Sequence, residues 1–196
     1  MQANNRLQAI RDTIRKLYTQ NNPDKDKWAD WLYEYHVLVV AEQARQLAAK
    51  YGANAEIAEV CALLHDIADA VTQRKDPEHE AKSLAIARDL LAKNSYSDDE
   101  ITLIVEDALR FHSCHNGEQP ASLEGKILST ADAYAHLKTD FYFHAIHMFK
   151  GIKTYRESKE WILAKLERDY NNKTLFEDEK NAWKRDYDIF KELFSR

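Results

Sequence analysis

Glycine and proline are scarce in this chain, which has 4 Gly and 3 Pro among 196 residues. An all-β fold needs these residue types for its many turns, so their scarcity favours helices joined by short loops. Apolar residues recur at the three- and four-residue spacing of a helix face, as in Leu7, Ile10, Ile14 and Leu17. The sequence therefore predicts an all-α fold that is long enough to bury a substantial core.

Capping and breaking signals divide the chain into successive helices. Asn54 is placed to cap one helix, and Ser97 followed by Glu100 forms a capping box at the start of another. The stretch 116–120 contains Asn, Gly and Pro and predicts a loop. The expected helices cover about 7–17, 28–50, 54–64, 78–93 and 97–108, followed by one long helix from about 122 to 148.

The C-terminal third contains aromatic stripes at helical spacing and no cluster of metal-ligating residue types. Such stripes are typical of a core or an interface, so we expect helices here that contribute to packing or to a homodimer. The stripes consist of Trp161, Ile162, Leu166 and Tyr170, and of Trp183, Tyr187, Phe190 and Phe194.

Charge and composition exclude several classes of protein. The 28 Lys and Arg residues and 33 Asp and Glu residues give a net charge of −5, which argues against a dedicated nucleic-acid-binding protein. No stretch approaches the roughly 20 apolar residues of a membrane span, and the first residues lack the apolar core of a signal peptide. Cys61 and Cys114 form no CxxC pattern. We therefore expect a reduced, cytoplasmic protein.

Residues able to bind a metal recur on apolar helical faces. Two of them, Asp66 and Asp132, are carboxylates in apolar runs without Arg or Lys close by in the sequence. A buried carboxylate without a cation is costly, so a divalent cation with neutral imidazole ligands would compensate both. Mixed His/Asp ligation suits Mn, Fe, Co, Ni or Zn, with Mg as the alternative if oxygen ligands dominate. The residues with this placement are His36, His65, Asp66, His79, His112 and Asp132.

The order of these residues resembles the HD superfamily of metal-dependent phosphohydrolases. His36, the His65-Asp66 doublet and Asp132 follow one another on separate expected helices, as the ligands of that family do. The resemblance covers about residues 28–137 and includes the stretches 62–67, 78–80, 96–101, 112–113 and 124–133. It implies one HD-type domain over 1–196, with a helical-bundle core at about 28–148 and a helical extension at about 149–196.

The same resemblance implies an activity and roles for particular residues. A divalent metal held by His36, His65, Asp66 and Asp132 would activate water to hydrolyse a nucleotide or related phosphate ester or anhydride. Asp66 is expected to act with that water, and Asp69, one turn later, is the candidate proton acceptor. The expected partner is a small phosphorylated molecule, and Arg74, Lys75 and Lys126 are candidate phosphate-binding residues.

Other interpretations stay open at this point. His79 and His112 match the order of ligands for a second metal, or they contact the substrate. The Gly-Tyr-Pro signature of binuclear cyclic-dinucleotide phosphodiesterases is missing after His112, which favours one metal. The alternatives to a phosphohydrolase are a di-iron oxygenase of the same fold and a non-catalytic metal- or nucleotide-binding protein. His136, His144 and His147 are expected to lie outside the ligand set.

Overall fold

The computed structural model describes residues 3–196, with side chains from residue 5 onward. This part of the chain is helical and contains no β-strand, only an isolated bridge between Lys150 and Lys153, so the all-α prediction is confirmed. None of the described helices has the length and apolar character needed to cross a membrane. The longer helices are α1 (Ala3–Thr19), α3 (Leu38–Tyr51), α4 (Ala55–Leu64), α5 (His79–Lys93), α7 (Leu123–Lys138), α8 (Phe141–Met148), α9 (Tyr155–Arg168) and α10 (Glu177–Ser195).

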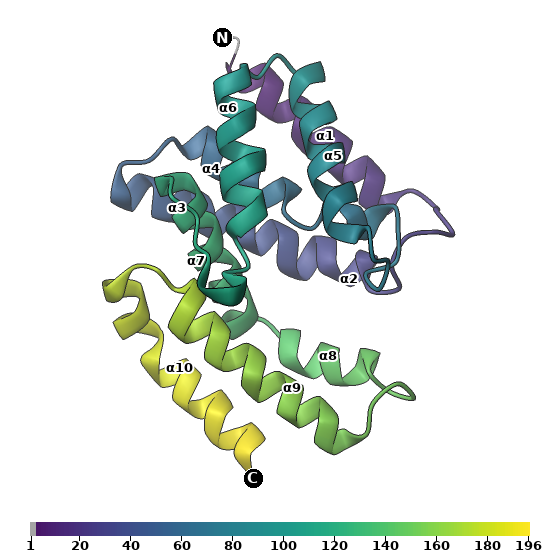
Figure 1. The fold of residues 1–196 in the computed structure, drawn as a ribbon, viewed down its shortest axis with the longest axis vertical. Coiled ribbons are helices and arrows are strands. Elements are labelled where there is room, and N and C mark those ends of the chain that lie inside the picture. The colour runs from purple at the N-terminus through teal and green to yellow at the C-terminus, as the bar shows by residue number, and fades with distance from the viewer. Residues whose placement is uncertain (1–2) are drawn as a thin grey trace.

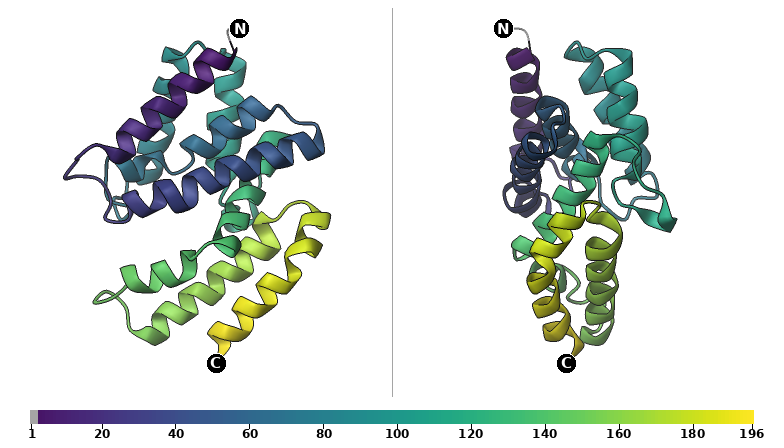
Figure 2. Two further views of the ribbon diagram at one scale, coloured as in Figure 1. Left: turned by 180° about the vertical axis from the view of Figure 1, so that it is seen from behind. Right: turned by 90° about the vertical axis from the view of Figure 1, so that its left-hand side faces the viewer.

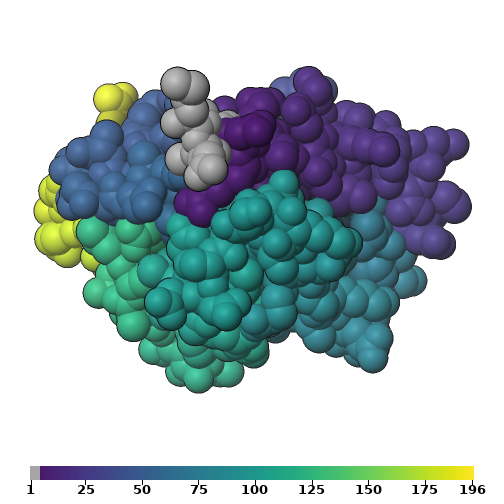
Figure 3. Space-filling view, turned by 90° about the horizontal axis from the view of Figure 1, so that it is seen from above, coloured from purple at the N-terminus to yellow at the C-terminus, as the bar shows by residue number. Residues whose placement is uncertain are grey.

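Two buried apolar clusters organise these helices into two layers. The larger cluster joins α1 to α7 and includes Ile14, Leu64 and Leu128. The smaller cluster lies among α8, α9 and α10 and includes Phe141 and Trp183. Helix α7 runs from the first layer into the second, as Figures 1 and 2 show. Seen from the α1 end, the N-terminal layer covers nearly all of the C-terminal helices (Figure 3).

Local sequence signals produce the helix starts that we expected. The Asn54 side chain accepts hydrogen bonds from the backbone N–H groups of Glu56 and Ile57, at 3.1 and 3.3 Å. Ser97 and Glu100 form the predicted capping box at the start of α6 (Asp98–Thr102). These bonds satisfy N–H groups that have no partner within the helix, and they set where each helix begins.

The helix expected at 28–50 is one continuous helical run with an irregular centre. It consists of α2 (Ala29–Leu32), the π-helical segment η1 (Tyr33–Val37) and α3. Further π-helical segments are η3 (Leu103–Leu109), which follows α6, and η5 (Asp169–Lys173), which follows α9. Such segments often occur at functional sites because the extra residue rotates the side chains that follow.

The prediction of one long helix from 122 to 148 is wrong, because the helix is interrupted between α7 and α8. Thr139 adopts an extended backbone, and its hydroxyl donates a 2.7 Å hydrogen bond to the carbonyl of Ala135. The break turns α8 so that Phe141 and Tyr142 enter the smaller core. Threonine favours such side chain-to-backbone bonds over helix continuation, and burial of two aromatic rings adds to that preference.

The aromatic stripes of the C-terminal third form most of the smaller core. The rings of Tyr170 and Tyr187 stack at a centroid distance of 4.1 Å, which joins η5 to α10. Trp183 meets the edge of Tyr134 on α7 at 5.2 Å. The second layer is therefore attached to the first through packed rings on α7.

Gly125 should not tolerate a side chain, because the start of α7 packs closely against Pro120 and Ala108 at this position. A Cβ atom at this position would lie 2.5 Å from Pro120 Cβ and 3.1 Å from Ala108 Cα. We expect Gly125→Ala to lower the free energy of unfolding by about 1–3 kcal/mol, measured by chemical denaturation. Ala121→Ser adds one atom at an exposed neighbouring position and should change stability by less than about 0.5 kcal/mol. Equal stabilities of the two variants would contradict the prediction.

Candidate metal centre

Three buried side chains from different helices converge on one point between the two layers. His36 comes from η1, His65 from the end of α4 and Asp132 from the middle of α7. Each offers one ligand atom, and these atoms all lie within 4.8 Å of one another. His36 Nε2 lies 3.0 Å from His65 Nε2 and 3.2 Å from Asp132 Oδ1. The structure thus brings together residues almost 100 positions apart in the sequence.

The protonation states of the side chains in this cluster suit the binding of a metal cation. His65 Nδ1 donates a 2.7 Å hydrogen bond to the carbonyl of Ala62, so its Nε2 carries the lone pair that faces the cluster. Burial lowers the pKa of His36, which keeps that imidazole neutral at pH 7. Asp132 Oδ1 is buried without a hydrogen-bond partner among the described residues. Two imidazole nitrogens and a free carboxylate oxygen fit a divalent transition metal.

Asp66 borders the same cluster from the turn that follows α4. The doublet lies at the end of that helix, and Asp66 Oδ2 is 3.5 Å from His65 Nε2 and 3.8 Å from His36 Nε2. Burial acts to raise the pKa of Asp66, but the guanidinium group of Arg74 holds it well below its usual value. Asp66 is therefore ionised beside the other ligand atoms.

Both carboxylates also have cationic partners from distant parts of the chain, which their sequence neighbours did not reveal. Arg74 lies 2.8 Å from Asp66 Oδ2. Lys173, which is 2% exposed, donates to Asp132 Oδ2. Burial opposes ionisation of Asp132, yet the Lys173 ammonium group keeps the pKa of this carboxyl well below its usual range. Because Lys173 binds Oδ2, the other oxygen of Asp132 remains directed at the imidazoles.

Asp69 binds Arg74, the cationic partner of Asp66. It is fully buried rather than solvated, and it accepts hydrogen bonds from Arg74 Nε at 3.1 Å and from His79 Nε2 at 3.2 Å. His79 thus faces Asp69, and it is not among the described residues that line the cavity beside the cluster. Asp69 fixes the guanidinium group that in turn neutralises Asp66.

His112 follows η3 and borders the cluster beside His65. Its ring meets the His65 ring edge-on at 5.5 Å, and its Nδ1 donates to the carbonyl of Leu109 at 2.7 Å. Burial lowers the pKa of His112 to about 4, so the ring is neutral and Nε2 is unprotonated. His79 and His112 are not brought together as a second ligand group within the described chain.

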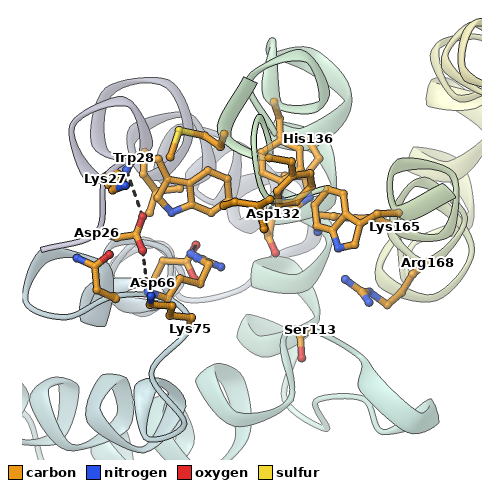
Figure 4. A pocket seen from close by; sticks show the side chains of 18 of the residues that line it. Asp26, Lys27, Trp28, Asp66, Lys75, Ser113, Asp132, His136, Lys165 and Arg168 are labelled. Carbon is orange, nitrogen blue, oxygen red and sulfur yellow. Dashed lines mark hydrogen bonds and ion pairs between the residues drawn. The ribbon is translucent and has the colours of Figure 1, made fainter. Parts of the chain in front are cut away.

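A cavity of about 670 Å³ opens beside the cluster and is bounded by both layers. Figure 4 shows Asp66 and Lys75 on one side, Asp132 and His136 at the back, and Lys165 and Arg168 reaching in from α9. Arg74 and Lys75 line this cavity as proposed for phosphate binding, whereas Lys126 is not among its described lining residues. The cationic lining residues are Lys27, Arg74, Lys75, Lys150, Lys153, Lys165, Arg168 and Lys173, against Asp26, Asp66 and Asp132.

The C-terminal helices supply site residues that sequence reasoning missed. Lys165, Asp169 and Lys173 form a stripe at four-residue spacing, with Nζ to Oδ1 distances of 3.3 Å for Lys165 and 4.0 Å for Lys173. The stripe is visible in the sequence, but its burial against Asp132 is not. His136 stacks on His36 at 4.9 Å and its Nδ1 lies 3.0 Å from Asp169 Oδ2.

The remaining histidines of α8 lie apart from the cluster. His144 stacks on Trp31 at a centroid distance of 4.4 Å, and its ring is 6.3 Å from that of His147. Neither residue belongs to the group of close ligand atoms found in the described part of the chain.

Asp69→Asn should destabilise the protein, because an amide cannot neutralise the charge of Arg74. We expect the free energy of unfolding to fall by about 2 kcal/mol, since Arg74 keeps Asp66 as a partner and is partly exposed. Chemical denaturation of the metal-free protein measures this loss. Asp24→Asn, at an exposed position without a side-chain ion pair among the described residues, is the control. A loss no larger than that of the control would refute the role of Asp69.

Comparison with known proteins agrees with this geometry. A family model described as HD domain matches residues 33–137, which is more than half of the chain. Ribonuclease Y of Symbiobacterium thermophilum is 35% identical over 99 residues, which cover 50% of this chain and 17% of that protein. No solved structure matches the chain significantly. The matched segment contains His36, the His65-Asp66 doublet and Asp132, and the chain belongs to the HD domain family, a superfamily of metal-dependent phosphohydrolases.

Proposed function

We propose that this protein hydrolyses a phosphate ester or anhydride of a nucleotide or a related small molecule. The observation that carries the proposal is the position of the ligand cluster at the wall of a cavity rich in cations. Eight Lys and Arg side chains line that cavity against three carboxylates. Because a phosphorylated ligand would balance this charge beside His36, His65, Asp66 and Asp132, the cavity favours such a substrate.

The residues around the cluster have separable tasks in this reaction. A divalent cation held there would polarise a phosphate oxygen and lower the pKa of a water molecule. Asp66 is paired with Arg74 and has a low pKa, so it serves as a ligand and hydrogen-bond acceptor. His112 turns Nδ1 to its own helix, which leaves an unprotonated Nε2 for the cavity. That nitrogen would accept a hydrogen bond from the attacking water and orient it.

Aromatic side chains favour a nucleotide among phosphorylated ligands. Trp28, Phe141, Phe149 and Trp161 line the cavity, and a base can stack on such rings. The cavity volume of about 670 Å³ falls in the range of small-molecule sites. A cavity of this size supports a single nucleotide better than a long nucleic acid, in agreement with the net charge of −5.

A substrate screen tests the proposal. Nucleoside mono-, di- and triphosphates and a short RNA are each incubated with Mn²⁺, Co²⁺, Ni²⁺ or Mg²⁺ without oxygen, and orthophosphate and pyrophosphate are measured separately. We expect metal-dependent phosphate release from a nucleotide. Product formed only with iron and oxygen would instead identify the oxygenase. Nucleotide binding without turnover would identify a non-catalytic protein, and preferred cleavage of RNA would indicate the activity that the name Ribonuclease Y states.

A further inference from the structure

Arg168 is a charged side chain of the cavity that has no hydrogen-bond or ion-pair partner among the described residues. Arg168, at the end of α9, lines the cavity, and its Nε is buried without a hydrogen-bond partner among the described residues. It also forms no ion pair with any described side chain, unlike Arg74, which binds both Asp66 and Asp69. Leaving a buried N–H of a charged group unsatisfied is costly, so this position calls for an acceptor from a ligand.

The charges around Arg168 indicate that this ligand is an anion. Lys165 and Lys173 share Asp169, and Lys173 also binds Asp132. Three cations on α9 and η5 therefore face two carboxylates, and a divalent cation in the metal centre would add to the positive excess. Burial, together with the neighbouring charges of Lys173 and Arg168, lowers the pKa of Lys165 to about 8, although Asp169 opposes this shift.

The location of Arg168 separates it from the metal centre. Lys173 contacts Asp132 and Lys165 contacts Asp169, whereas no ion pair joins Arg168 to a residue of the ligand cluster in the described part of the chain. In Figure 4, Arg168 and Lys165 project from α9 into the cavity from the side opposite to Asp66 and Lys75. One phosphate group bound at the metal centre would leave Arg168 without a counter-charge.

We propose that Arg168, with Lys165, forms a second phosphate subsite facing the metal centre, so that the protein favours substrates carrying two or more linked phosphates. The planar guanidinium group binds phosphate oxygens in pairs, which suits it to a terminal phosphate. This inference rests on the proposed function, because it assumes that the first phosphate binds beside the ligand cluster. It assigns nucleoside di- and triphosphates, rather than monophosphates, as the substrate class.

Equilibrium binding of inorganic pyrophosphate and orthophosphate to the Mn²⁺-loaded protein tests the subsite by calorimetry. We expect wild type to bind pyrophosphate more tightly, and Arg168→Ala to weaken pyrophosphate binding roughly 10- to 100-fold while orthophosphate binding changes less than about threefold. Arg168→Lys should recover part of the loss. Lys126→Ala removes a cation that does not line the cavity and should leave both affinities unchanged.

The proposed subsite would be wrong if Arg168→Ala weakened the binding of pyrophosphate and of orthophosphate equally. It would also be wrong if the substitution weakened the binding of neither anion. These results are distinct from failure of the proposed function, in which the wild-type protein neither binds Mn²⁺ nor hydrolyses any nucleotide. Circular dichroism verifies the helical fold of each variant. If Arg168→Ala does not fold, the same affinity ratio is measured with Arg168→Gln, which keeps part of the aliphatic stem and a polar end group, and an unchanged ratio there rejects the proposal.

Discussion

Replacing Asp132 with Asn should weaken Mn²⁺ binding and metal-dependent hydrolysis by at least about 100-fold. The carboxylate offers a buried oxygen without a hydrogen-bond partner among the described residues, and His36 Nε2 lies 3.2 Å from it. An amide of the same shape lacks the charge that compensates a divalent cation. Equilibrium dialysis with Mn²⁺ and steady-state hydrolysis of the best nucleotide measure the two losses.

The control for Asp132→Asn must separate lost ligation from lost stability. The substitution leaves the buried ammonium group of Lys173 with only its 4.0 Å contact to Asp169, which is destabilising by itself. The double variant Asp132→Asn/Lys173→Met removes both charges, so it should regain stability while metal binding stays lost. Asp98→Asn changes an exposed carboxylate and should bind Mn²⁺ like wild type. Wild-type metal content in either Asp132 variant would disprove the assignment of this ligand.

The helices could be predicted from the sequence because their signals are local. Apolar spacing and the caps at Asn54 and Ser97 involve residues within one or two turns of each other. The break at Thr139 could not be read in the same way, since Phe141 and Tyr142 leave the line of α7 to join a core built with α9 and α10. Tertiary packing decides such boundaries, and periodicity alone does not report it.

The candidate ligands could likewise be predicted, whereas their charged neighbours could not. His36, His65 and Asp132 each occupy an apolar helix face, and inward-facing polar groups in such runs meet in a shared interior. Lys173 contacts Asp132 across 41 residues of sequence. Its place depends on η5, where the backbone carbonyl of Lys173 accepts hydrogen bonds from Ser129 and Thr130. No local pattern in a polar stretch encodes such a contact.

Lys173→Met should cause the largest loss of stability of any single substitution described above. Asp132 is 4% exposed, and in the metal-free protein the substitution would leave its charge without the ammonium partner. Removing one partner of a buried ion pair costs about 3–5 kcal/mol. Methionine keeps the length of the side chain, and the backbone bonds from Ser129 and Thr130 do not depend on it. Chemical denaturation in a chelator should therefore show this loss.

Addition of Mn²⁺ should then stabilise Lys173→Met more than it stabilises wild type. A divalent cation bound to Asp132 compensates the negative charge that Lys173 neutralises in wild type. Metal binding should therefore raise the free energy of unfolding more in Lys173→Met, where the ammonium group is missing. Lys184→Met removes an exposed partner of Asp188 and should change stability by less than about 1 kcal/mol, with or without metal. If Lys173→Met matched wild type in the chelator, Lys173 would not be the cation that holds Asp132 ionised.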